Sequence, residues 1–242
     1  MGGLINRKRS TLVIAHRAAG AGCPENSLAG IRAAGGSGVD IVEVDVRRTI
    51  DGVPVLIHAP ILGRRTDGHG LVRRARARRI ARRRLEGSPE TVPTLEEALD
   101  ALPDGVVIGI HVKDRGVLPA VLSIVERREV EARTWLLLER SHDVGTATRR
   151  CPGLRVILLN DWGREPSVER YLARAEAAGA TAVSIPWGQV TPASMDEAHG
   201  RGLVVISTER SREELPSKVA AGLDGVTTDD PVGLVQSLAA MS

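Results

Sequence analysis

The opening of the chain, residues 12–46, reads LVIAHRAAGAGCPENSLAGIRAAGGSGVDIVEVDV. It begins with an aliphatic run at Leu12–Ala15 and ends with a β-branched run at Asp40–Val46, and the segment Ser27–Ala34 between them has a helical pattern. Strand-like runs that alternate with helices are typical of a parallel sheet covered by helices. The stretch therefore predicts a strand, a helix and a second strand of one such sheet.

The same alternation continues along the rest of the chain. Eight strands are expected, at Leu12–Ala15, Asp40–Val46, Pro54–His58, Val106–Val112, Thr134–Leu138, Leu154–Leu159, Ala182–Ile185 and Leu203–Ser207. Helices are expected at Ser27–Ala34, Thr94–Leu102, Pro119–Glu129, Val168–Ala178, Pro192–Arg201, Glu213–Ala221 and Val232–Ala240, with a further strand-like piece at Gly225–Thr228. Eight units in 242 residues give about 30 residues each, which suits a strand, a helix and two connections. We therefore expect an α/β fold, a single TIM-like (β/α)8 barrel, with a doubly wound open sheet as the alternative.

The composition indicates one domain with an aliphatic core. Hydrophobic residues make up 42% of the chain but aromatic residues only 2%, with no Phe. Cys23 and Cys151 are too few for a disulfide framework, and the apolar run after the charged residues 7–9 is too short for a signal peptide. No stretch approaches the length of a transmembrane helix. We expect a cytoplasmic protein with an N-terminal segment at 1–11 and a barrel domain at 12–242.

An arginine-rich connection at about 64–88 interrupts the alternation, with eight arginines between Arg73 and Arg84. One interpretation is a solvated connection whose charge is balanced by acids elsewhere. The other is a docking surface for anionic phosphate or lipid headgroups. The segment has no interleaved aromatics and no strong apolar face, so we expect no nucleic-acid partner and no membrane insertion. Peripheral contact with an anionic membrane stays open.

Ionisable side chains gather near the carboxyl ends of the first four predicted strands. They are His16 and Arg17, Glu43 and Asp45, His58, and His111 with Lys113. In a barrel this edge is the catalytic mouth. Singly, each has a structural explanation, such as a packed histidine or a surface ion pair. Together, two carboxylates for a divalent cation, two cations for an anion and two imidazoles for proton transfer are suited to phosphodiester cleavage.

Several motifs carry a family resemblance. They are His16-Arg17, Pro24-Glu25-Asn26, Glu43-Val44-Asp45-Val46, Thr49-Ile50-Asp51-Gly52, Val53-Pro54-Val55, His58 and Pro93-Thr94-Leu95-Glu96-Glu97. Their order and spacing resemble the glycerophosphodiester phosphodiesterase family over roughly residues 12–231. The resemblance implies a TIM-like barrel that hydrolyses glycerophosphodiesters to glycerol 3-phosphate and an alcohol with a bound divalent metal. It also implies an acid/base pair at His16 and His58, phosphate contacts from Arg17 and Lys113, and metal ligands at Glu43 and Asp45.

The chain departs from the family pattern at a metal ligand. His111 stands where the family has a third metal-binding Glu, two residues before Lys113. Two carboxylates and an imidazole suit Mn²⁺, Fe²⁺, Co²⁺ or Zn²⁺ better than Mg²⁺ or Ca²⁺. We expect one divalent ion, Mg²⁺, Ca²⁺ or Mn²⁺, with His111 as a ligand that shifts the preference toward Mn²⁺ or another transition metal. Two alternatives are that the metal is lost and that Glu139 replaces the missing carboxylate.

A second departure lies in the last predicted strand, which reads Ile206-Ser207-Thr208-Glu209 where the family commonly has a Trp-Thr-Val-Asn run. Glu209 adds a negative charge to the mouth, and Trp187, which ends the seventh predicted strand, is a candidate to replace the pocket wall that the missing Trp would form. Two functional hypotheses follow. The first is an active metal-dependent phosphodiesterase with a small-molecule glycerophosphodiester, or a related specialised diester, as its substrate. The second is a non-catalytic barrel that binds phosphate ligands or a partner after the loss of the third metal carboxylate.

Overall fold

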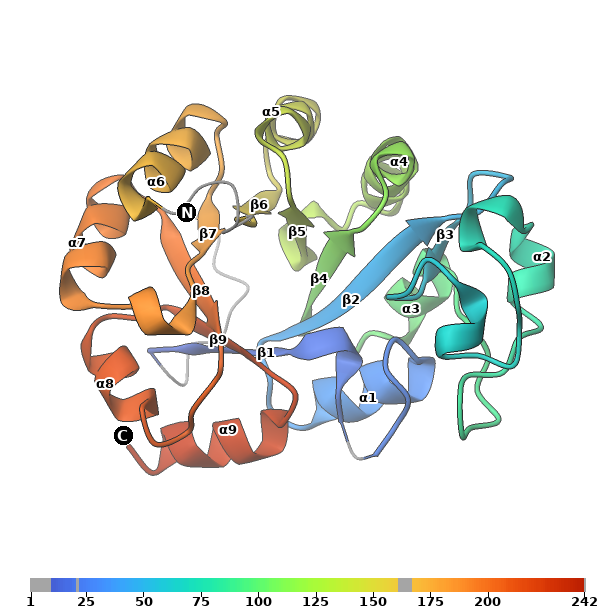
Figure 1. Ribbon diagram of the computed structural model, residues 1–242, viewed down its shortest axis with the longest axis horizontal. Helices are drawn as coiled ribbons and strands as arrows, with labels where there is room; N and C mark the ends of the chain where they lie inside the picture. The colour runs from blue at the N-terminus through green and yellow to red at the C-terminus, as the bar shows by residue number, and fades with distance from the viewer. Residues whose placement is uncertain (1–9, 21, 161–166, 242) are drawn as a thin grey trace.

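The fold is a closed barrel of eight parallel strands with helices around it (Figure 1). The computed structural model describes residues 10–20, 22–160 and 167–241, so residues 1–9 of the expected N-terminal segment lie outside the described ranges. The barrel strands are β1 (Leu12–Ala15), β2 (Ile41–Arg48), β4 (Val107–Val112), β5 (Thr134–Leu138), β6 (Arg155–Leu158), β7 (Ala182–Ser184), β8 (Val204–Thr208) and β9 (Gly225–Thr228). Strand β1 pairs with both β2 and β9. The ring therefore closes, which confirms the TIM-like barrel over the open sheet.

One predicted barrel strand was wrong. Strand β3 (Pro54–Leu56) pairs antiparallel with β2 and lies outside the ring, and β9 takes the place that we expected Pro54–His58 to fill. The cause is a tight turn, in which the Val53 amide donates to Thr49 Oγ1 at 2.9 Å and Gly52 adopts a φ of 82°. So short a connection joins antiparallel strands, because parallel neighbours need a crossover.

The expected helices are present, with ends that differ by a few residues. They are α1 (Leu28–Gly36), α3 (Leu95–Ala101), α4 (Leu118–Arg128), α6 (Val168–Ala177), α7 (Pro192–Gly200), α8 (Leu215–Ala220) and α9 (Pro231–Ala239). Helix α5 (Ser141–Arg150) was not predicted, because only Val144 and Ala147 of its side chains are buried and the apolar pattern is weak. Within the described ranges, every helix is too short or too polar to span a bilayer.

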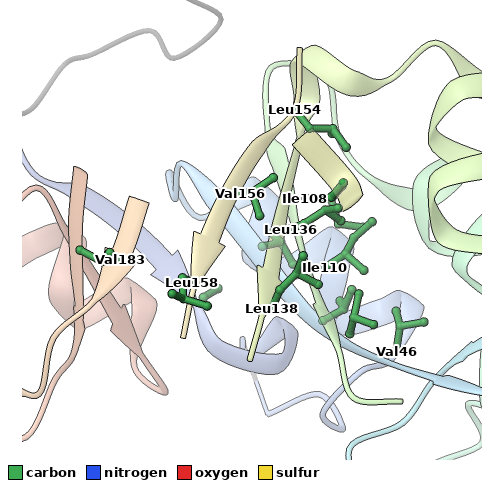
Figure 2. Packing of buried hydrophobic residues seen from close by; sticks show 14 of the residues in the cluster. Val46, Ile108, Ile110, Leu136, Leu138, Leu154, Val156, Leu158 and Val183 are labelled. Atoms are coloured by element: carbon green, nitrogen blue, oxygen red, sulfur yellow. The ribbon is translucent and has the colours of Figure 1, made fainter. Parts of the chain in front are cut away.

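Alternating side chains along the strands build two apolar layers. The layer inside the barrel contains Leu12, Ile14, Ile41, Val107, Trp135, Leu137, Ile157, Ala182 and Ile206. The layer between strands and helices includes Ile108, Ile110, Leu136, Leu138, Val156 and Leu158, which Figure 2 shows on β4 to β6. Because Ile41 points inward, Glu43 and Asp45 also point inward, nearer the carboxyl end of β2. The same alternation directs His111 inward, four residues after Val107.

The arginine-rich insertion, residues 59–93, folds as a small unit on β3. It contains α2 (Ala77–Ile80) and two 3₁₀ turns, at Leu62–Arg64 and Val72–Arg74. A separate apolar cluster supports it, made of Val55, Ile57, Leu62, Val72, Ala75, Ile80, Leu85 and Val92. In Figure 1 the insertion stands at one edge of the molecule, opposite α6 and α7.

Candidate active site

The segment after β1 adopts an uncommon backbone conformation that serves the site. Arg17 and Ala18 have φ values of 52° and 56°, in the left-handed region that favours glycine. The conformation directs the Arg17 amide to Glu43 Oε2 at 2.7 Å, and the Arg17 carbonyl accepts from the Asn26 amide at 2.8 Å. Asn26 in turn receives the Asp45 amide on its side-chain oxygen at 2.8 Å. The loop is thus tied to the two acids of β2.

Glu43, Asp45 and His111 form a cluster of candidate metal ligands. One donor atom from each residue lies within 4.8 Å of the others. The side chains of Glu43 and Asp45 are 2% and 1% exposed, and His111 Nδ1 lies 3.8 Å from Glu43 Oε1 and 3.4 Å from Asp45 Oδ1. Strands β2 and β4 bring these residues together, because Asp45 and His111 are paired across the parallel register.

The charges of this cluster suit a bound cation. Burial, with the nearby Asp45 charge, raises the pKa of Glu43 to about 8, because two desolvated carboxylates disfavour a second negative charge. Burial also lowers the pKa of His111, which favours the neutral imidazole that ligates metals. Two carboxylates and a neutral imidazole facing one point therefore fit a divalent ion, and such a mixed donor set favours a transition metal over Mg²⁺ or Ca²⁺.

Glu139 lies on the other side of His111. Its Oε1 is 3.5 Å from His111 Nε2, whereas Nδ1 of the same ring faces Glu43 and Asp45. The hydrogen bond to His111 lowers the pKa of Glu139. The cluster found in the described residues does not include Glu139. Glu139 therefore contacts the ring nitrogen of His111 other than the one that faces Glu43 and Asp45.

Two cations flank the same acids. Arg17 Nε lies 3.4 Å from Asp45 Oδ2, and its Nη1 lies 3.2 Å from Glu25 Oε2. Lys113 Nζ lies 3.7 Å from Asp45 Oδ1 and 3.4 Å from His111 Nε2. Because both cations adjoin the metal-ligand cluster, an anion held by them would lie next to a bound metal.

The two predicted catalytic histidines differ in their surroundings. His16 Nδ1 lies 2.7 Å from Asp229 Oδ1, at the end of β9. His58, just after β3, has its pKa lowered by burial, and the charges of Asp45, Arg17 and Lys113 also act on its ring. His58 therefore lies within the electrostatic reach of the candidate metal centre, although its strand is outside the barrel.

A cavity of about 620 Å³ opens beside His16 and Arg17, lined otherwise by residues 208–212 and 227–230. Glu209, expected to add negative charge here, forms an ion pair with Arg212 and accepts from Thr228 Oγ1 at 2.6 Å. Its charge is thus compensated, which sequence reasoning missed. Trp187 is buried, its Nε1 donates to Glu214 at 3.0 Å, and it is not among the residues that line this cavity.

Asp229 and Arg212 are site residues to which the sequence analysis assigned no role. Asp229 stands in the stretch Gly225-Val226-Thr227-Thr228-Asp229, so its place at the end of a strand was the available signal. Arg212 lies in the loop after β8, three residues from Glu209, and such spacing is common enough to carry no signal.

The comparisons with known proteins identify a family and a fold. The model of the glycerophosphoryl diester phosphodiesterase family matches residues 16–232. A glycerophosphodiester phosphodiesterase from Caldanaerobacter subterraneus subsp. tengcongensis is 26% identical over 240 residues, which cover 93% of this chain and 96% of the relative.

Solved structures share the fold. A glycerophosphodiester phosphodiesterase from Agrobacterium tumefaciens has a TM-score of 0.82 at 21% identity, covering 95% of this chain and 99% of its own. An Oleispira antarctica phosphodiesterase, solved in complex with the product sn-glycerol-3-phosphate, has a TM-score of 0.79 at 22% identity, covering 94% and 96%.

Proposed function

Because this chain belongs to the glycerophosphoryl diester phosphodiesterase family and is thus a phosphoric diester hydrolase, we propose that it hydrolyses a glycerophosphodiester to glycerol 3-phosphate and an alcohol with the help of a divalent metal. The observation that carries the proposal is the convergence of Glu43, Asp45 and His111 at one barrel edge, beside two cations. The glycerol 3-phosphate bound to the Oleispira antarctica relative supports the product.

Within this proposal, Glu43, Asp45 and His111 hold the metal, which when bound supplies positive charge to the phosphate. Arg17 and Lys113 bind the phosphate oxygens. In the described residues, they are the arginine and the lysine that form ion pairs with the acids of the ligand cluster. Their guanidinium and ammonium groups would offset the charge that otherwise repels an attacking oxygen.

The histidines take opposite proton-transfer roles. The lowered pKa of His58 keeps its ring neutral near pH 7, so His58 accepts the proton of the glycerol hydroxyl next to the phosphate as its oxygen forms a new P–O bond. The resulting cyclic phosphate is then opened by water to give glycerol 3-phosphate. His16 can ion-pair with Asp229 when it is protonated, so it donates a proton to the departing alkoxide as the ester P–O bond breaks. Asp229 is a positioning residue in this scheme.

The experiment is release of glycerol 3-phosphate from a panel of glycerophosphodiesters with Mg²⁺, Ca²⁺ or Mn²⁺. The double variant His16→Ala, His58→Ala should lose about a thousandfold or more of the turnover, since each proton transfer contributes about 10²–10⁴-fold. The matched control is His142→Ala, because this ring is 86% exposed on α5. Equal turnover in the double variant and the control would contradict the assignment of the histidines.

The metal preference is tested with His111. The wild type should prefer Mn²⁺. His111→Glu should shift the preference toward Mg²⁺, because a third carboxylate gives the site only oxygen ligands, which hard cations such as Mg²⁺ prefer. If the folded wild type turns over no diester with any metal and holds no stoichiometric metal on elemental analysis, the non-catalytic barrel replaces the enzyme hypothesis.

A further inference from the structure

A cationic surface covers the arginine-rich insertion. The exposed arginines are Arg64, Arg65, Arg73, Arg74, Arg76, Arg78, Arg79, Arg82 and Arg84, which we call the insertion surface. Residues 71–83 contain no acid. The acids of the insertion lie toward its ends, where Asp67 pairs with Arg84 at 3.9 Å and Glu86 pairs with Arg65 at 3.4 Å.

The centre of this surface lacks compensating charge. Among the residues that the structure describes, Arg65 and Arg84 are the arginines of this surface that form ion pairs, and the five at its centre, Arg73, Arg74, Arg78, Arg79 and Arg82, form none. The interpretation of a connection balanced by acids elsewhere therefore holds for Arg65 and Arg84 but not for these five. Unpaired like charges repel one another, so an anionic partner would stabilise them.

The fold holds these arginines in place. Ile80 and Leu85 are buried in the cluster that packs the insertion on β3, so the segment is not a loose tail. Its backbone is also tied to the β2–β3 turn, because the Ile50 amide donates to the Ala75 carbonyl and the Ala77 amide donates to Asp51 Oδ1, both at 2.9 Å. Several cations are thus presented together by one folded unit.

Two exposed apolar side chains accompany the charge. Ile50 and Ile61 are 55% and 45% exposed, and they are two of the four large hydrophobic side chains that are exposed in the described residues. Ile50 bonds to the insertion backbone, and Ile61 pairs with Leu71 within it. No aromatic residue lies in 59–93, so stacking on nucleic-acid bases is not provided for. Arginines with exposed aliphatic side chains favour the interface of an anionic bilayer.

The insertion is also connected to the candidate active site. Arg65 Nε lies 3.5 Å from Glu25 Oε1, and the other oxygen of Glu25 lies 3.2 Å from Arg17 Nη1. His58 directly precedes the insertion. We propose that the insertion surface binds an anionic lipid bilayer and holds the barrel mouth next to it. The binding does not depend on the proposed hydrolysis.

The test is co-sedimentation of the full chain with phosphatidylcholine vesicles, with and without phosphatidylserine. The test variant changes Arg73, Arg74, Arg78 and Arg79 to Gln. The control variant makes the same change in charge at exposed arginines on the barrel helices, namely Arg32, Arg127, Arg149 and Arg170. Because each arginine near an anionic surface contributes to binding, the test variant should bind at least about 100-fold more weakly. The control variant should bind like the wild type.

Three further results decide the outcome. Raising the salt to about 0.5 M should release the wild type, because screening shortens the range of the attraction. Equal binding of both variants, or equal binding to neutral vesicles, would overturn the proposal. A wild type that ignores the vesicles but binds a single-stranded oligonucleotide through the same arginines would assign the surface to nucleic acid. Turnover of a soluble glycerophosphodiester is measured separately, so loss of hydrolysis and loss of binding remain distinguishable.

Discussion

The two sides of the barrel mouth differ in how far their charged side chains are buried. On the β2–β4 side, Glu43 and Asp45 are buried. Nitrogen atoms of Arg17, Lys113 and His111 all lie within 3.7 Å of the carboxylate oxygens of Asp45. On the β8–β9 side, Asp229 and Asp230 are 85% and 69% exposed, and their partners reach solvent. Solvent cannot compensate a charge that is buried away from water. Substitutions of charged residues on the buried β2–β4 side should therefore reduce turnover more than substitutions on the open β8–β9 side.

The largest effect is expected from Asp45→Asn. This substitution keeps the shape but removes the charge that faces Arg17, Lys113 and the metal site, so kcat should fall about a thousandfold or more and bound metal should be lost. Steady-state kinetics and elemental analysis measure the two effects. The matched control is Asp230→Asn on the open side, since Asn also caps the start of α9. Similar losses in both variants would show that burial does not distinguish the two sides.

A smaller effect is expected from Asp229→Asn. Asp229 lies on the β8–β9 side and contacts His16, which directly follows β1. The amide can no longer form an ion pair with the His16 imidazolium, so kcat should fall about 10- to 100-fold with little change in KM. An increase in KM at constant kcat would instead place Asp229 in substrate binding.

The sequence predicted the buried side better than the open side. Glu43 and Asp45 lie two apart on β2, and Lys113, which directly follows β4, lies two residues after His111, so local alternation directs each pair to one face. The bond between His16 and Asp229 joins residues 213 apart, and no local pattern predicts which residue closes a barrel. The same limit explains β3, because whether a short strand turns back or joins the ring depends on its partner strand.

The smallest effect concerns stability without metal. In the folded protein the pKa of Glu43 is raised from 4.5 to about 8, so the folded state binds a proton that the unfolded state releases. The stabilisation is therefore complete below about pH 4.5 and is lost as the pH rises through about 8. With a chelator present, the free energy of unfolding should fall in this window by at most about 1.4 kcal/mol per pH unit from this group. Urea unfolding at several pH values measures the decline, which Glu43→Gln should flatten. Added Mn²⁺ should also flatten it in the wild type, because a cation favours the ionised carboxylate, and an unchanged decline in Glu43→Gln would place the titrating group elsewhere.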